Sequence, residues 1–221
     1  MITDLLQQRF PSEYGLPADN IVVSAQTCSG NYVLSDERAC GQCRDSRPER
    51  RCCNGENLRI EFGENNIVLV DFENYISQYE HTAAEISERC DYLFVDDECH
   101  TKIAFCDLTC SDMKYVVPNK GLYKLGKRAK AVAQMTNSLE CLLNVPLLDH
   151  YMLTFPVKVC LFGWRDYASE KMETDGGNVE RSIAEFMKTP SSMARLLQWE
   201  VPIIGHSFEF VQVKYPDAYV W

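Results

Sequence analysis

The chain has 221 residues, 46% of them hydrophobic, and a formal net charge of −10. This length suits one domain, and the hydrophobic share is ample for a core. The acidic balance argues against a free-standing nucleic-acid binder, which would carry a basic surface, and the lack of any run of about 18 apolar residues argues against a transmembrane helix.

The first residues, MITDLLQQRFPSEYG, carry acid and glutamine where a signal peptide needs a basic end and an apolar middle, so we expect a cytoplasmic protein. They also predict a short amphipathic helix, because apolar residues recur at helical spacing at Ile2, Leu5, Leu6 and Phe10. A strand is expected next at residues 20–23, after a Pro/Gly turn.

Residues 28–57 form an irregular, cysteine-rich segment. The chain has 11 cysteines, and in a reducing compartment a cluster of them points to metal. The turn of Cys40-x-x-Cys43 would bring two thiolates to one side of a tetrahedral, structural Zn²⁺. The second half of the site would be one of Cys52 and Cys53, together with the other or with Cys28.

The central stretch, residues 90–110, predicts a hairpin. Residues 58–62 and 67–75 precede it as strand-like runs, and residues 78–89 suggest one or two helical turns. Two short apolar runs, 92–95 and 103–106, flank a polar turn and favour neighbouring strands. We expect strands 90–97 and 102–110 to be adjacent, with Asp91 opening the first apolar run and Asp107 closing the second.

After a loop at 111–122, residues 124–143 predict a helix. Its apolar stripe comprises Leu125, Ala129, Val132, Thr136, Leu139 and Leu143, and the opposite side carries Lys127, Lys130, Gln134 and Asn137. The charge also changes sign here. Residues 61–99 hold eleven acids against one arginine, whereas residues 102–130 hold seven bases against two acids.

The rest of the chain predicts a buried strand at 155–163, a polar loop, two short helices at 179–188 and 191–200, and a strand at 207–215. The aromatic tail 218–221 suggests a docking contact rather than a free end. Four cysteines within apolar runs are interpreted as small core residues: Cys90, Cys106, Cys141 and Cys160.

The order strand–strand–helix–strand across residues 58–163, with an acid on each hairpin strand, resembles the PD-(D/E)xK (restriction-endonuclease-like) nuclease superfamily. The resemblance implies a mixed sheet flanked by helices, with Asp91 and Asp107 holding Mg²⁺ and a lysine two residues after Asp107. The chain has Thr109 at that position, so the D-x-K motif is degenerate. Some relatives bind an iron–sulfur cluster through cysteines flanking the core, which makes such a cluster the alternative to zinc.

A replacement for the missing lysine is hard to find in the sequence. Strand alternation puts Lys102 on the opposite face from Asp107, and nothing else on the face of Asp107 and Thr109 is expected to supply charge. Some members of the superfamily place a displaced lysine or a glutamine on the following helix near the phosphate. This makes Lys127, Lys130 and Gln134 the candidates for that role.

We therefore expect one α/β domain over residues 1–221, with a cysteine-rich insertion (28–57), a nuclease-like core (58–163) and a C-terminal part of helices and a closing strand (164–221). The favoured function is a catalytically degenerate, nuclease-like subunit of a bacterial antiphage-type complex. Its partner would be an ATPase or a nuclease subunit, and nucleic acid would be reached through the complex. The alternatives are an active Mg²⁺-dependent DNA endonuclease with a helix lysine, and a zinc-stabilised protein-interaction module.

Overall fold

A computed structural model describes residues 1–17, 19–35, 56–79, 89–110, 116, 126–165 and 204–221. The helices are α1 (Ile2–Glu13), α2 (Phe72–Ser77), α4 (Gly126–Leu143) and α5 (Leu148–Leu153). The strands are β1 (Ala25–Cys28), β2 (Asn31–Ser35), β3 (Glu56–Glu61), β4 (Ile67–Asp71), β5 (Tyr92–Val95), β6 (Lys102–Cys110), β7 (Val157–Arg165), β8 (Glu209–Lys214) and β9 (Ala218–Val220).

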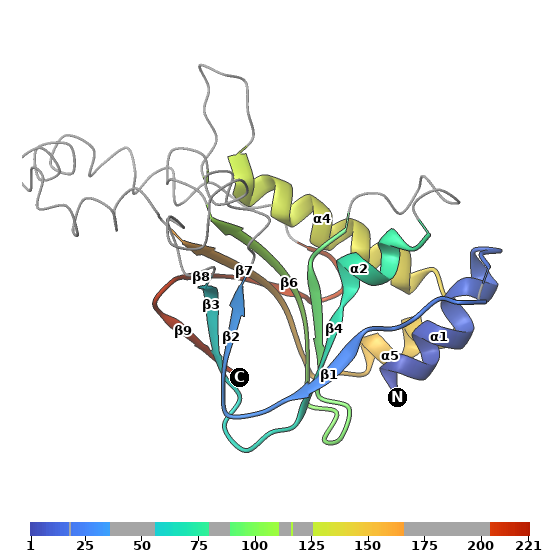
Figure 1. Ribbon diagram of the computed structural model, residues 1–221, viewed down its shortest axis with the longest axis horizontal. Coiled ribbons are helices and arrows are strands. Elements are labelled where there is room, and N and C mark those ends of the chain that lie inside the picture. The colour runs from blue at the N-terminus through green and yellow to red at the C-terminus, as the bar shows by residue number, and fades with distance from the viewer. Residues whose placement is uncertain (18, 36–55, 80–88, 111–115, 117–125, 166–203) are drawn as a thin grey trace, which may run out of the picture.

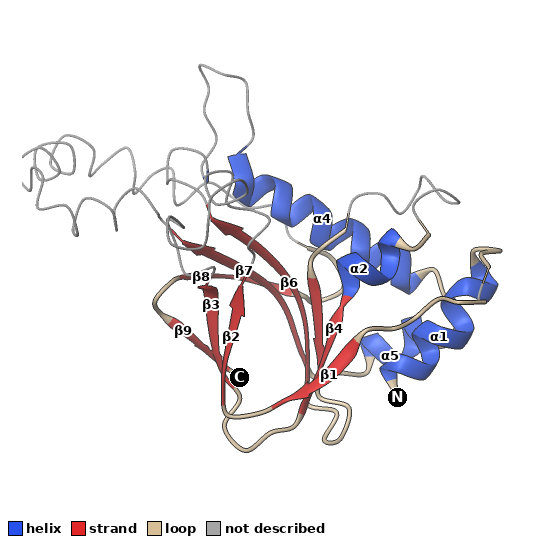
Figure 2. Cartoon of the chain, in the orientation of Figure 1, coloured by secondary structure: helices blue, strands red, loops and turns tan. Residues whose placement is uncertain are grey.

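These elements form three layers, with a mixed sheet between the helices and a second, smaller sheet (Figures 1 and 2). The main sheet has six strands in the order β1-β4-β5-β6-β7-β8, and the small sheet has the order β2-β3-β9. The pairs β1–β4, β4–β5 and β5–β6 are antiparallel, whereas the pairs β6–β7 and β7–β8 are parallel. The expected α/β class with a mixed sheet is confirmed; among the described residues, helices cover one face of that sheet and the small sheet covers the other.

The hairpin of residues 90–110 is confirmed as two paired strands, β5 and β6. They are antiparallel from Tyr92↔Cys106 to Val95↔Ile103. Parallel strands need a crossover connection, and helix α4 lies in the connection between β6 and β7. The order strand–strand–helix–strand that the sequence predicted is therefore present.

Strand β6 is buried on both faces, which explains its nearly continuous apolar sequence. Ile103 and Phe105 belong to the hydrophobic cluster that includes residues of all four helices. Ala104, Cys106 and Leu108 belong to the cluster between the two sheets. Odd-numbered positions of β6 therefore face the helices, and even-numbered positions face the small sheet. This alternation decides which functional candidates share a surface.

Helix α4 matches the predicted helix in position but presents a different face to the core. Its buried residues are Ala131, Val132, Met135, Ser138, Leu139, Cys141 and Leu142. Successive residues of a helix are ~100° apart around its axis, and the centre of this buried face lies nearly that angle away from the centre of the predicted apolar stripe. The stripe was misplaced because Ser138 and Cys141, which are small, fit against the sheet as well as larger apolar residues do. Lys127 and Lys130 are exposed, as expected.

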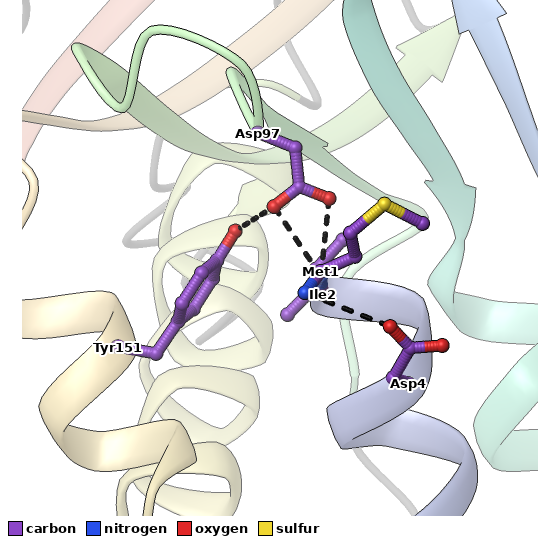
Figure 3. Close-up of polar contacts among 5 residues, drawn as sticks. All are labelled: Met1, Ile2, Asp4, Asp97 and Tyr151. Atoms are coloured by element: carbon purple, nitrogen blue, oxygen red, sulfur yellow. Dashed lines mark hydrogen bonds and ion pairs between the residues drawn. The ribbon is translucent and has the colours of Figure 1, made fainter.

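The hairpin turn anchors the helical layer to the sheet. The carboxylate of Asp97 accepts hydrogen bonds from the backbone N–H of Ile2, at 3.1 and 3.3 Å, and from the hydroxyl of Tyr151 (Figure 3). Ile2 opens α1 and Tyr151 belongs to α5. The carboxylate therefore satisfies a free N–H at a helix start that lies 95 residues away in the chain.

Three sequence predictions need correction. Residues 20–23 are not a strand, and the strand of this region is β1 at residues 25–28. The backbone of Val22 is instead bonded by the side chain of Gln78, which donates to the Val22 carbonyl at 2.9 Å and accepts its N–H at 3.0 Å. The side chain of Gln78 thus makes the two backbone hydrogen bonds that a neighbouring strand would otherwise make with Val22.

The second correction concerns the expected strand at 67–75. It ends at Asp71, whose carboxylate accepts a hydrogen bond from the Asn74 N–H at 3.0 Å and caps helix α2. The third is that α5 and β2 were not predicted. The helix expected at 78–89 falls largely on residues outside the described ones, and the two helices expected at 179–188 and 191–200 fall there entirely.

The C-terminal tail docks, as the sequence predicted. Strand β9 pairs in parallel with β3, and the Trp221 N–H donates to the Glu61 carbonyl at 3.0 Å. The indole ring of Trp221 lies edge-on to Phe62, with ring centroids 5.4 Å apart, and 6.1 Å from Phe94. The tail thereby helps to cover the inner face of the small sheet.

Candidate functional site

Asp107 and Thr109 lie on the helix-covered face of the main sheet, at the open end of the hairpin. They occupy odd positions of β6 and are only 6% and 4% exposed. Asp91 directly precedes β5, whose paired register ends at Tyr92↔Cys106. The Asp91 N–H donates to the carbonyl of Cys106, the partner of Tyr92, so the register is interrupted at Asp91 as in a β-bulge. Strand alternation therefore places Asp107 and Thr109 on one face, with Asp91 at the same end of the hairpin.

The main chain of Asp91 is held by two other elements. Its carbonyl accepts the N–H groups of Phe72 and Glu73, at 2.9 and 3.0 Å, from the first turn of α2. Its N–H donates to the carbonyl of Cys106 at 3.0 Å. Its carboxylate oxygen Oδ2 accepts the N–H of Leu108 at 2.7 Å. The carboxylate is thus fixed to the stretch of β6 that carries Asp107 and Thr109.

Helix α4 fixes the residues that lead into Asp91. The side-chain amide of Gln134 donates to the carbonyl of Arg89 at 2.7 Å, and the hydroxyl of Ser138 accepts the N–H of Cys90 at 2.9 Å. Ser138 in turn donates to the Gln134 carbonyl at 2.8 Å. Gln134, which the sequence suggested as a phosphate contact, is thus engaged in holding this backbone. The role of Ser138 was not predicted from the sequence, because a serine within a helix has no distinctive pattern.

Two buried thiols flank the acidic pair. Burial raises the pKa of Cys90 and of Cys106 well above the usual value, and the charges of Asp91 and Asp107 add to this effect. Both thiols are therefore in the neutral form at neutral pH. Together with Cys141 and Cys160 they are buried, as the sequence predicted.

The structure separates the lysines that the sequence considered. Lys102 lies on the opposite face, as predicted, with its ammonium 5.2 Å from the Tyr219 ring centroid and 5.1 Å from that of Trp221. Lys127 and Lys130 are exposed on α4. The basic residue on the sheet-facing side of α4 is instead Arg128, whose guanidinium carbon lies 5.7 Å from the centroid of the Phe210 ring.

The expectation that no other charge lies on the face of Asp107 and Thr109 is wrong. Thr109 pairs with Trp164 on β7, and Trp164 pairs with Lys214 on β8. Side chains in register on parallel strands point to the same face. The Lys214 ammonium lies 5.3 Å from the centroid of the Trp164 ring. Sequence reasoning missed Lys214 because it lies 105 positions after Thr109 and only strand order brings it near.

The predicted metal ligands of the cysteine-rich segment fall mostly on residues outside the described ones: Cys40, Cys43, Cys52 and Cys53. Cys28 ends β1 and is buried between the two sheets. Burial raises the pKa of its thiol.

Among the described residues, no group of three or more His, Cys, Asp or Glu side chains is arranged to hold a metal ion. Asp91 and Asp107 are a pair without a third such ligand in that part of the chain. Mg²⁺ is commonly bound by one or two carboxylates with water and phosphate oxygens completing the shell. The pair thus fits a cation of that type only together with ligands from solvent or a bound phosphate.

Comparison with known proteins finds no matching family model, no similar curated protein and no similar solved structure. The fold and the site define a mixed α/β protein with Asp107 and Thr109 on one sheet face and Asp91 at the same end of the hairpin. Within the described ranges, no helix has the length and apolar character needed to cross a membrane.

Proposed function

We propose that this chain is a nuclease-like protein whose catalytic site is degenerate, and that it works as a subunit of a nucleic-acid-associated complex of the bacterial defence type. The observation that carries the proposal is that Asp107 and Thr109 share one sheet face, with Thr109 where a lysine would be needed, and that the Asp91 carboxylate is bonded to Leu108 between them. The order of β5, β6, α4 and β7 supports a restriction-endonuclease-like core.

The chemistry of position 109 supports loss of activity. A threonine hydroxyl carries no positive charge and is no base at neutral pH. Removing a group that stabilises the charge of a transition state typically costs ~10²–10³ in rate.

The acid pair supports a retained cation site. The Asp91 carboxylate is held in place by the Leu108 N–H. Asp91 and Asp107 would hold Mg²⁺, which when bound would polarise a phosphate oxygen. The net charge of −10 supports a partner that carries most of the nucleic-acid contacts, such as an ATPase or an active nuclease subunit.

The first test is cation binding, read from Tb³⁺ luminescence. Tb³⁺ is a hard cation with oxygen ligands, and Trp164, the neighbour of Thr109 in register, would excite it by energy transfer. We expect a luminescent site that Mg²⁺ displaces, that Asp107→Asn abolishes and that Trp164→Phe dims. The matched control Glu64→Gln removes an exposed acid from a turn and should change nothing. Equal luminescence in wild type and Asp107→Asn would remove the proposed cation site.

The second test is cleavage of plasmid and single-stranded DNA with Mg²⁺ or Mn²⁺. We expect no cleavage by wild type. Robust cleavage abolished by both Asp107→Ala and Lys127→Ala would instead establish the active endonuclease with a helix lysine. Any activity gained by Thr109→Lys would support a site that lost its chemistry and kept its fold. Capture of the natively expressed chain, with mass spectrometry of what is bound, would identify the partner subunit.

A further inference from the structure

A row of three residues crosses the main sheet beside the acid pair. Thr109 of β6, Trp164 of β7 and Lys214 of β8 are in register and share the helix-covered face. Two strand spacings of ~4.8 Å separate the main chains of Thr109 and Lys214. The Lys214 ammonium lies over the Trp164 ring, which places it on the side of β8 toward Thr109.

Two buried donors on this face have no acceptor. The indole N–H of Trp164 and the Nε–H of Arg128 are buried and make no hydrogen bond within the described part of the chain. Trp164 is 2% exposed. A buried donor without a partner costs ~1–3 kcal/mol and calls for an explanation. Both donors would suit an anion.

Two cations lie on the same face as these donors. Lys214 and Arg128 lie on aromatic rings, Trp164 and Phe210, rather than on carboxylates. Among the described residues, neither is in an ion pair with an acid. A cation on an aromatic ring keeps its charge available to a ligand. This contrasts with Arg59, which has Glu56 within 3.9 Å.

We propose that this row is a phosphate-binding site, with Lys214 as its principal cationic contact and Arg128 as the second. The inference rests on the proposed function and deepens it, because it gives the degenerate site a ligand of its own: a phosphate group next to Asp107. Lys214 supplies, from two strands away, the positive charge that position 109 lacks. Asp91 and Asp107 lie at the same end of the sheet, so the phosphate would bind best with a divalent cation present.

The phosphate has two possible sources, the backbone of a nucleic acid and a free phosphate ion. The experiment separates them by fluorescence anisotropy of a labelled oligonucleotide, single- and double-stranded, at low ionic strength with Mg²⁺. Inorganic phosphate is titrated in parallel and read from the emission that Trp164→Phe removes. Displacement of the oligonucleotide only by millimolar phosphate assigns the site to a polymer backbone, and saturation by micromolar phosphate assigns it to a free ion.

The decisive variant is Lys214→Ala, with Lys158→Ala as matched control. Lys158 occupies the helix-covered face at the opposite end of β7, in register with Ile103. A lost charge-assisted contact of ~1.5–3 kcal/mol corresponds to roughly a 10- to 100-fold weaker affinity. Lys214→Ala should also lower the slope of log affinity against log salt by ~1. Lys214→Arg should restore binding, and Lys158→Ala should leave it unchanged.

Equal affinities and salt slopes for wild type and Lys214→Ala, with both variants folded by circular dichroism, would overturn the assignment. So would a loss of affinity that Lys158→Ala reproduces, since that would indicate a general charge effect. Neither outcome touches the proposed function, which stands or falls with Tb³⁺ binding at Asp107. Conversely, loss of the Tb³⁺ site with Lys214-dependent phosphate binding intact would refute the proposed function alone.

Discussion

Replacing Gly163 by alanine would put a methyl group into a filled contact between the two sheets. Gly163 belongs to β7 and pairs with Leu108 of β6. A Cβ built there would lie 2.8 Å from Leu108 Cδ2 and 2.8 Å from Leu58 Cβ. The Leu108 methyl can rotate away, but the Cβ of Leu58 is fixed to the backbone of β3. The backbones must therefore separate.

Overpacking of this kind typically costs ~1–3 kcal/mol. Alanine also restricts the unfolded chain, which returns ~0.4–1 kcal/mol, so we expect a net loss of about 1–2 kcal/mol. At ~2–4 °C per kcal/mol for a chain of this size, the melting temperature should fall by ~2–8 °C. Because Leu108 lies between Asp107 and Thr109 and donates to Asp91, Tb³⁺ affinity should fall as well.

The measurement is urea unfolding followed by circular dichroism, with Tb³⁺ titration of the same samples. Gly205→Ala is the matched control, because a Cβ there would meet nothing within 4 Å. We expect that variant to be neutral or slightly more stable than wild type. A Gly163→Ala protein as stable as Gly205→Ala would refute the view that the small sheet packs against β7 at this point.

The remaining predictions concern stability, acid sensitivity and metal. Tyr151→Phe removes the hydroxyl that donates to Asp97. Because a hydrogen bond to a charged acceptor is worth ~1.5–3 kcal/mol, we expect the free energy of unfolding to fall by about that amount, and an unchanged urea midpoint would contradict this prediction. Burial alone would raise the pKa of Asp96, but hydrogen bonds from Thr101 and Cys99 and the charge of His100 lower it overall. The contribution of the Asp96 carboxylate to folding stability should therefore be complete above the unfolded pKa of ~3.9 and be lost as pH falls through the lower pKa of the folded protein. In Asp96→Asn, the free energy of unfolding should depend less on pH over this acid range. Protein purified without added metal should contain close to one zinc per chain, lost in Cys40→Ser; neither zinc nor iron by elemental analysis would remove the metal site.

Local sequence was enough wherever a pattern has one structural solution. The apolar runs of the hairpin could only be short neighbouring strands, and β6, buried on both faces, carries the nearly continuous apolar run that such burial favours. Alternation along β6 placed Lys102 on the opposite face from Asp107, since the side-chain period of a strand is fixed at two. Helix α1 followed from its spacing, and Ile2, Leu6 and Phe10 are buried.

Elements decided by distant partners could not be predicted. Residues 20–23 have strand-forming side chains, but the side chain of Gln78 satisfies Val22 in place of a strand. The face that α4 turns to the sheet depends on which side chains fit there, so Arg128 rather than Lys127 reaches the sheet.

The acid pair and its missing lysine were visible in the sequence because they lie within one hairpin, where strand geometry relates every position to its neighbours. Lys214 was not, because the order β6-β7-β8 is a property of the assembled sheet. Hydrogen bonding between parallel strands carries no local signal that says which segment lies beside which. The sequence alone therefore determined which residues of β6 share a face, and only the tertiary structure decided that Lys214 of β8 lies on that face, two strands away.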